Sequence, residues 1–137
     1  MSDANKAAQR RFVEEYQSKG DVGVAEELLA PDFVDHTPMP PIPGTRDGVM
    51  QLFAMLRGAF PDLRAEIHDL LTDGDEVVTR KTFHGTHRGE FMGIPATGKE
   101  VAWDVIDIVR YRDGQMTDHW NVVDAYGLMH QLGAIPG

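Results

Sequence analysis

Two aspartates stand among large apolar residues near the C-terminal end of this chain. Asp107 and Asp124 lie in the two segments that flank the pair Asp113-Gly114, and both segments are rich in Val, Ile and Trp. Burying a carboxylate without a partner is costly and usually raises its pKa. A carboxyl group with a raised pKa can exchange a proton with a carbon next to a carbonyl group. We therefore take both aspartates as candidates for general acid/base catalysis.

The pair Asp113-Gly114 predicts how the two segments face each other. Asp-Gly between alternating apolar runs is a strong β-hairpin signal, because both positions tolerate the positive φ of a type I′ turn. Counting outward from the turn sets Asp107 opposite Trp120, and opposed residues share a face. The predicted inner face consists of Trp103, Val105, Asp107, Val109, Trp120, Val122 and Asp124. The predicted outer face consists of Ala102, Asp104, Ile106, Ile108, His119, Asn121 and Val123.

Two histidines are further candidates. His36 follows the short segment Phe33-Val34-Asp35 and precedes a proline-rich loop. From there it could reach the mouth of a cavity as a proton donor or shuttle, and we include it among the catalytic candidates. His119 is predicted on the face opposite Trp120, so a structural role is favoured for it.

Each aspartate also has a structural interpretation. Asp124 precedes a short helical segment and could cap it. Asp107 could form an ion pair with Arg80 or Arg110. The sequence leaves the catalytic and structural interpretations open.

Aromatic side chains could form the walls of a pocket for a ring-bearing substrate, although each could equally be an ordinary core residue. With Arg80 as a polar contact, the predicted substrate-binding residues are Tyr16, Phe33, Phe60, Arg80, Trp103 and Trp120.

The composition excludes several classes of function. The chain of 137 residues has a net charge of −9 and no cluster of Lys or Arg, which argues against nucleic-acid or anionic-membrane partners. It has no cysteine, so thiol catalysis and thiolate metal sites are excluded. No apolar run approaches the roughly 20 residues of a membrane span, and the first residues lack a signal-peptide pattern. We expect a single domain in the cytoplasm.

The order of the predicted elements is helices first and antiparallel strands afterwards. Helices are predicted over 4–19 and 21–30, and from Thr45, as N-cap, to Pro61, with a short strand over 32–37 and a proline-rich loop over 38–44. Strands over 63–68 and 76–87, joined at Asp73-Gly74, precede the long hairpin and a short helix over 125–133. This order predicts an α+β fold with helices on one face of a curved sheet.

Several motifs resemble the SnoaL-like polyketide cyclases, or ester cyclases, of the NTF2-like superfamily, over nearly the whole chain. They are Phe33-Val-Asp-His36, Ala59-Phe-Pro-Asp62-Leu, Gly85-Thr-His87-x-Gly89-x-Phe91-x-Gly93-Ile-Pro-Ala-Thr-Gly98-Lys99, Asp113-Gly-x-x-x-Asp-His119-Trp120 and Gln131-Leu-Gly-Ala134. The resemblance implies a cone-shaped α+β domain over residues 1–137, with N-terminal helices on a strongly curved, mainly antiparallel sheet.

The resemblance also implies an activity: an aspartate on the last strand acts as general acid/base in an intramolecular aldol ring closure, without metal or cofactor. The predicted face of the hairpin matches Asp124 to this aspartate, whereas an alignment keyed on His119-Trp120 places Asn121 there. The expected function is cofactor-independent acid/base catalysis on a hydrophobic small molecule, as a cyclase, isomerase or dehydratase. The alternatives are an epoxide hydrolase or a non-catalytic binding protein on the same scaffold, since fold alone does not settle function.

The predicted outer face of the hairpin is too apolar for water, because it carries Ala102, Ile106, Ile108 and Val123. Large exposed apolar patches usually mark interaction sites. We therefore expect a homodimer formed through the outer face of the sheet.

Overall fold

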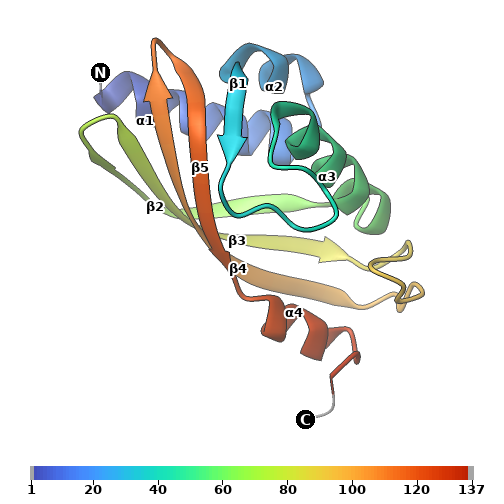
Figure 1. Cartoon of the computed structure of the whole chain (residues 1–137). Coiled ribbons are helices and arrows are strands. Elements are labelled where there is room, and N and C mark those ends of the chain that lie inside the picture. Colours follow the sequence, from blue (N-terminus) through green and yellow to red (C-terminus); the bar gives the residue numbers. More distant parts are fainter. Residues whose placement is uncertain (1, 136–137) are drawn as a thin grey trace.

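A curved five-stranded sheet forms the frame of the protein, and the N-terminal helices pack along one side of it (Figure 1). The computed structural model describes residues 2–135. The strands, in the spatial order β1-β5-β4-β3-β2, are β1 (Leu29–Asp35), β5 (Gln115–Val123), β4 (Glu100–Arg112), β3 (Glu76–Thr86) and β2 (Arg64–Asp73). The helical elements are α1 (Ser2–Arg11), η1 (Phe12–Gln17), α2 (Val22–Leu28), α3 (Arg46–Ala59) and α4 (Ala125–Gln131). The predicted α+β cone is confirmed. Only β1 runs parallel to its neighbour, β5.

The first predicted helix changes from α-helical to π-helical hydrogen bonding partway along its length. After Arg11 the α-helix continues as the π-helical segment η1, in which the Ser18 amide donates to the Val13 carbonyl five residues earlier at 3.0 Å. π-Helical turns inside helices are often found at functional sites. In this turn Phe12 and Gln17, five residues apart, both reach the interior cavity.

Helix α3 begins where the sequence predicts. The hydroxyl of Thr45 accepts a hydrogen bond from the Gly48 amide at 3.1 Å, so Thr45 is the N-cap. Its side chains Phe53, Leu56 and Ala59 are buried against the sheet. No helix within residues 2–135 is both long and apolar enough to cross a bilayer.

The hairpin turn is confirmed, but the predicted register beyond it is wrong. Asp113 and Gly114 have φ of 53° and 78°, as a type I′ turn requires. Tyr111 pairs with Met116, whereas Arg110 pairs with Asp118, so Thr117 is one extra residue in β5. This β-bulge moves the partner of Asp107 from Trp120 to Asn121.

A one-residue slip exchanges the two faces of a strand. On β4 the predicted faces are correct, because Trp103, Val105, Asp107 and Val109 are all buried. On β5 they are reversed: His119, Asn121 and Val123 point inward, and Val122 is 76% exposed. The bulge thus decides which β5 side chains reach the interior.

Phe60 forms the centre of an aromatic cluster beneath the cavity wall. It is fully buried, and its ring lies 5.2 Å from that of Trp103 and 5.4 Å from that of Phe91. It does not line the cavity, unlike those two neighbours. Phe60 therefore supports the wall from behind instead of forming it.

We predict that Phe60→Ala lowers the free energy of unfolding by about 3–5 kcal/mol, because it removes a buried ring and leaves a void. The matched control is Leu71→Ala, which truncates a side chain that is 60% exposed on β2. The control should change stability by less than about 0.5 kcal/mol. Urea unfolding of both variants measures the difference, and equal losses would contradict this assignment.

Candidate functional site

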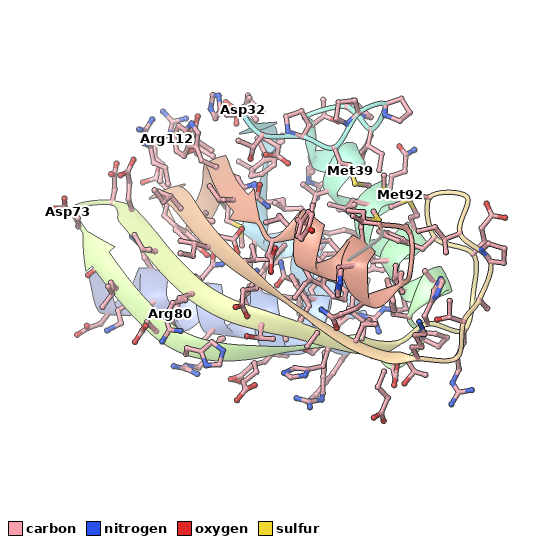
Figure 2. All side chains as sticks on the ribbon, turned by 90° about the horizontal axis from the view of Figure 1, so that it is seen from below. Asp32, Met39, Asp73, Arg80, Met92 and Arg112 are labelled. Carbon is pink, nitrogen blue, oxygen red and sulfur yellow. The ribbon has the colours of Figure 1, made fainter. Side chains whose placement is uncertain are left out.

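A cavity of about 430 Å³ lies between the helices and the inner face of the sheet. Most of its wall is apolar, and Met39 and Met92 line it from two different loops (Figure 2). Its polar lining residues are Gln9, Gln17, Asp35, Thr37, Lys81, Asp107, His119 and Asn121. An apolar cavity with a few converging polar groups is the usual form of a small-molecule site.

Four of these polar residues form a continuous line across the sheet, which we call the charged row. It consists of Asp35, His119, Asp107 and Lys81, one from each of the neighbouring strands β1, β5, β4 and β3. His119 Nδ1 lies 2.9 Å from Asp35 Oδ1, and His119 Nε2 lies 2.7 Å from Asp107 Oδ1. Lys81 Nζ lies 2.6 Å from Asp107 Oδ2. Acidic and basic groups therefore alternate along the row.

Asp107 and Lys81 are buried and the other two members of the row are half-buried, and the four side chains influence one another's protonation. Burial by itself would raise the pKa of Asp107, but the charge of Lys81 and the hydrogen bond from His119 lower it to about 2. Burial would lower the pKa of His119, but hydrogen bonds to Asp107 and Asp35 raise it to about 9. Asp35 has a lowered pKa as well: burial raises it, and the hydrogen bond from His119 more than offsets this. At neutral pH His119 is an imidazolium between two carboxylates.

The β1–β5 pairing brings Asp35 to the row. Asp35 pairs with His119, and the His36 amide donates to the His119 carbonyl at 2.9 Å. The amide of Thr37 donates to Asp35 Oδ1 at 3.0 Å and so orients this carboxylate. The hydrogen bonds of the Asp35 carboxylate therefore converge on Oδ1, and Oδ2 has no partner among residues 2–135.

Asn121 stands beside the row with an amide side chain. The hydroxyl of Thr37 donates to Asn121 Oδ1 at 2.8 Å, and the Asn121 main-chain amide donates to the same hydroxyl at 2.9 Å. Asn121 lines the cavity, where it can donate a hydrogen bond from Nδ2 but cannot act as an acid at neutral pH.

Asp124 lies elsewhere. Its carboxylate accepts a hydrogen bond from the Gly127 amide at 2.9 Å, which makes it the N-cap of α4, and it does not line the cavity. The capping interpretation is confirmed. The prediction that Asp124 shares the inner face with Asp107 is wrong, because the bulge at Thr117 reverses the end of β5.

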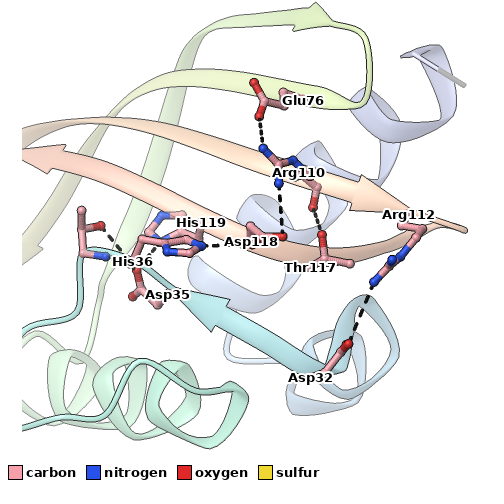
Figure 3. Close-up of polar contacts among 10 residues, drawn as sticks. Asp32, Asp35, His36, Glu76, Arg110, Arg112, Thr117, Asp118 and His119 are labelled. Atoms are coloured by element: carbon pink, nitrogen blue, oxygen red, sulfur yellow. Dashed lines mark hydrogen bonds and ion pairs between the residues drawn. The ribbon is translucent and has the colours of Figure 1, made fainter.

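His36 and Trp120 meet on the outer side of the hairpin, away from the cavity lining. Their rings stack with centroids 4.6 Å apart, and Arg110 Cζ lies 5.2 Å from the centre of the Trp120 ring. His36 Nε2 lies 3.0 Å from Asp118 Oδ2 (Figure 3). The predicted placement of Trp120 inside the pocket is therefore wrong, again because of the bulge. His36 holds the start of the proline-rich loop against β5.

The remaining predicted contacts divide between the cavity wall and the layers around it. Phe33 and Trp103 line the cavity. Tyr16 is buried behind the lining residue Phe53, with ring centroids 5.5 Å apart, as Phe60 is behind Trp103. Arg80 is exposed and pairs with Asp69 at 2.6 Å, so the predicted pairing of Asp107 with Arg80 or Arg110 is wrong.

The sequence prediction missed Lys81, Asp35 and the inward direction of His119. Every second residue of this part of β3 is buried, and Lys81 shares this buried face with Val77, Thr79 and Phe83. This alternation, aligned with a neighbouring apolar strand, is the signal that could have identified Lys81. His119 has no such local signal, because its direction depends on the bulge.

We predict that the His119 imidazole titrates near pH 9, well above an ordinary histidine. Since folding raises its pKa, protonated His119 stabilises the fold fully below about pH 6.5, and this contribution is lost as the pH rises through 9. The titration is measured by long-range ¹H–¹⁵N correlation of the imidazole nitrogens. His119→Gln is the matched control, and it should lose less stability than the wild type over this window. A midpoint below pH 7 would contradict the paired imidazolium.

Known proteins with the same organisation identify the family. The family model described as SnoaL-like polyketide cyclase matches residues 7–132. Aklanonic acid methyl ester cyclase DnrD from Streptomyces peucetius is 30% identical over 129 residues, which span 90% of this chain and 87% of that protein. Among solved structures, IdmH, a putative polyketide cyclase from Streptomyces antibioticus, is 34% identical with a TM-score of 0.82, covering 94% of this chain and 98% of IdmH. AclR, a putative hydroxylase from Streptomyces galilaeus, is 28% identical with a TM-score of 0.90, covering 100% of this chain and 85% of AclR. The chain belongs to the SnoaL-like polyketide cyclase family.

Proposed function

We propose that this protein catalyses an acid/base ring closure of the intramolecular aldol type on an apolar, carbonyl-bearing small molecule, without a cofactor. The observation that carries the proposal is the position of His119, held between Asp35 and Asp107 on the wall of an apolar cavity. Within residues 2–135, His119 is the one histidine that lines the cavity. Strongly perturbed titratable groups in a pocket are typical of functional sites.

The relatives support a cyclase and suggest the first substrate to test. DnrD is named for aklanonic acid methyl ester, and IdmH is described as a putative polyketide cyclase. AclR, with the same fold, is described as a putative hydroxylase, so the fold does not select the reaction. The side chains of the cavity must select it. These side chains include acidic and basic groups and apolar aromatic rings.

The proton transfers can be assigned to the charged row. Asp35, through its unpartnered Oδ2, accepts the proton of the carbon that becomes the nucleophile. The new carbon–carbon bond forms as the attacked carbonyl oxygen takes a proton from His119. A proton then passes from Asp35 to His119, which restores the carboxylate and the imidazolium. No proton is gained or lost overall, as an isomerising ring closure requires.

Asp107 stabilises the imidazolium in this scheme and is itself held by Lys81. Asp124, which the sequence predicted on the inner face of the hairpin, is assigned no proton transfer because it caps α4 outside the cavity. Asn121 is a neutral donor to the substrate. The proposed acid/base groups are thus His119 and Asp35, instead of Asp124 after the end of β5.

We predict that His119→Gln and Asp35→Asn each lower the turnover of aklanonic acid methyl ester by about 10²–10⁴-fold, the usual range for positioned acid/base groups. Asp124→Asn is the matched control. It should keep wild-type turnover and fold, because Asn caps a helix almost as well as Asp. Product formation is followed by chromatography, and circular dichroism checks folding. Full activity in folded His119→Gln would remove His119 from the mechanism, and binding without turnover in the wild type would indicate a binding protein.

The outer face of the hairpin supports a second proposal, which concerns assembly. Ile106 and Val122 pair directly across β4 and β5 and are 47% and 76% exposed. Ile108 and Trp120 form the next pair on the same face. This patch differs from the one predicted from the sequence, because Val122 replaces the inward-pointing Val123. We propose that two copies associate through this patch as a symmetric dimer.

We predict that the double variant Ile106→Lys/Val122→Lys is monomeric while the wild type is dimeric, because charges buried across an interface are costly. Light scattering at micromolar concentration gives the mass of each. The control is Val22→Lys, at an exposed apolar position at the start of α2, which should stay dimeric. A monomeric wild type contradicts the proposal.

A further inference from the structure

The cavity wall holds a hydrogen-bond donor that the charged row does not use. Gln17, at the end of η1, lines the cavity and is 6% exposed. Its Oε1 accepts a hydrogen bond from Lys81 Nζ at 2.9 Å. An ammonium group has only donors, so Gln17 must present its oxygen to Lys81. The amide nitrogen of Gln17, with two N–H groups, then has no partner among residues 2–135.

Lys81 contributes a second donor at the same place. Its ammonium group has three N–H bonds. One of them donates to Gln17 Oε1, and Nζ also forms an ion pair with Asp107 Oδ2 at 2.6 Å, so at least one N–H remains for a ligand. Lys81 lines the cavity, with Nζ 5.0 Å from the centre of the Phe83 ring. Gln17 and Lys81 are therefore hydrogen-bonded to each other, and each keeps at least one N–H that is free to bind a ligand.

The chemistry of this pair fits an oxygen that carries negative charge. Donors that are already oriented in a water-poor cavity stabilise developing charge much more than they do in water. Both groups are held in place: Lys81 by Asp107 and Gln17, and Gln17 by its buried position on η1. Within the described part of the chain Gln17 itself contacts no carboxylate, and the carboxylate of Asp107 is paired with the ammonium group of Lys81 at 2.6 Å.

We propose that Gln17 and Lys81 form an oxyanion-binding pair, which receives the enolate oxygen of the substrate. The identity of the ligand as an enolate rests on the proposed function. The pair is separate from the proton-transferring groups: His119 and Asp35 move the proton, while Gln17 and Lys81 hold the oxygen on which charge appears.

The test uses 4-nitrophenolate as an oxyanion probe and 4-nitroanisole as its neutral counterpart of similar shape. Both are titrated by calorimetry at mildly alkaline pH, where the probe is ionised and His119 is still charged. The wild type should prefer the phenolate. Gln17→Met removes the amide donor while keeping the side-chain length, and it should reduce this preference about 10–100-fold, because hydrogen bonds to charged groups are strong. Binding of 4-nitroanisole should be unchanged.

The matched control is Gln9→Met. Gln9 also lines the cavity from the N-terminal helix, but its Oε1 is held by the Tyr111 hydroxyl at 2.7 Å instead of by a cation. It should keep the wild-type preference for phenolate. If Gln17→Met does not fold, Gln17→Glu serves instead, since it preserves the acceptor for Lys81 and should weaken phenolate binding at least as much.

An unchanged phenolate preference in a folded Gln17 variant overturns the inference. So does an equal loss in Gln9→Met, because the effect would then be general to the cavity. The readout is binding alone, so it separates this inference from the proposed function. Loss of the preference in Gln17→Met together with an inactive wild type would leave the oxyanion pair standing and remove the cyclase proposal.

Discussion

The buried contact between Lys81 and Asp107 is the interaction on which the interior of this protein depends. Both side chains are almost fully buried, and an ion pair in such a place needs further hydrogen bonds to offset the cost of removing its charges from water. His119 supplies the partner on one side and Gln17 on the other. Removing one member would leave a buried charge unpaired, at a cost of about 3–5 kcal/mol. The chain therefore must bring together β3, β4, β5 and η1 in one register.

The bulge at Thr117 makes this register compatible with the tight Asp113-Gly114 turn. Near the turn Tyr111 and Met116 pair as the turn dictates, and both are buried. One extra residue then allows Asp118 to face outward and His119 inward. The outward side chains form their own cluster, in which Asp118 contacts His36 and Arg110. The same irregularity thus organises the cavity wall and the outer surface.

This arrangement relates the family's fold to the particular chemistry of this chain. The chain shares its fold with the solved relatives, while the reaction depends on a few side chains within the cavity. Here an amide, Asn121, stands at one of two positions that the resemblance matches to an acid/base aspartate. The other, Asp124, caps a helix. The titratable side chains that line the cavity come instead from β1, β3, β4 and β5.

The sequence by itself determined the features that depend on neighbours along the chain. The Asp113-Gly114 turn, the Thr45 cap and the helix-then-strand order follow from local backbone preferences, and the alternation on β4 placed Asp107 inside. The tertiary structure alone decided the rest. Asp35 and His119 are separated by 84 residues and meet because β1 pairs in parallel with β5. Lys81 points inward because β3 pairs with β4, and His119 does so because of a bulge. A one-residue slip changes no local preference, yet it reverses every side chain beyond it, so only long-range packing selects between the two registers.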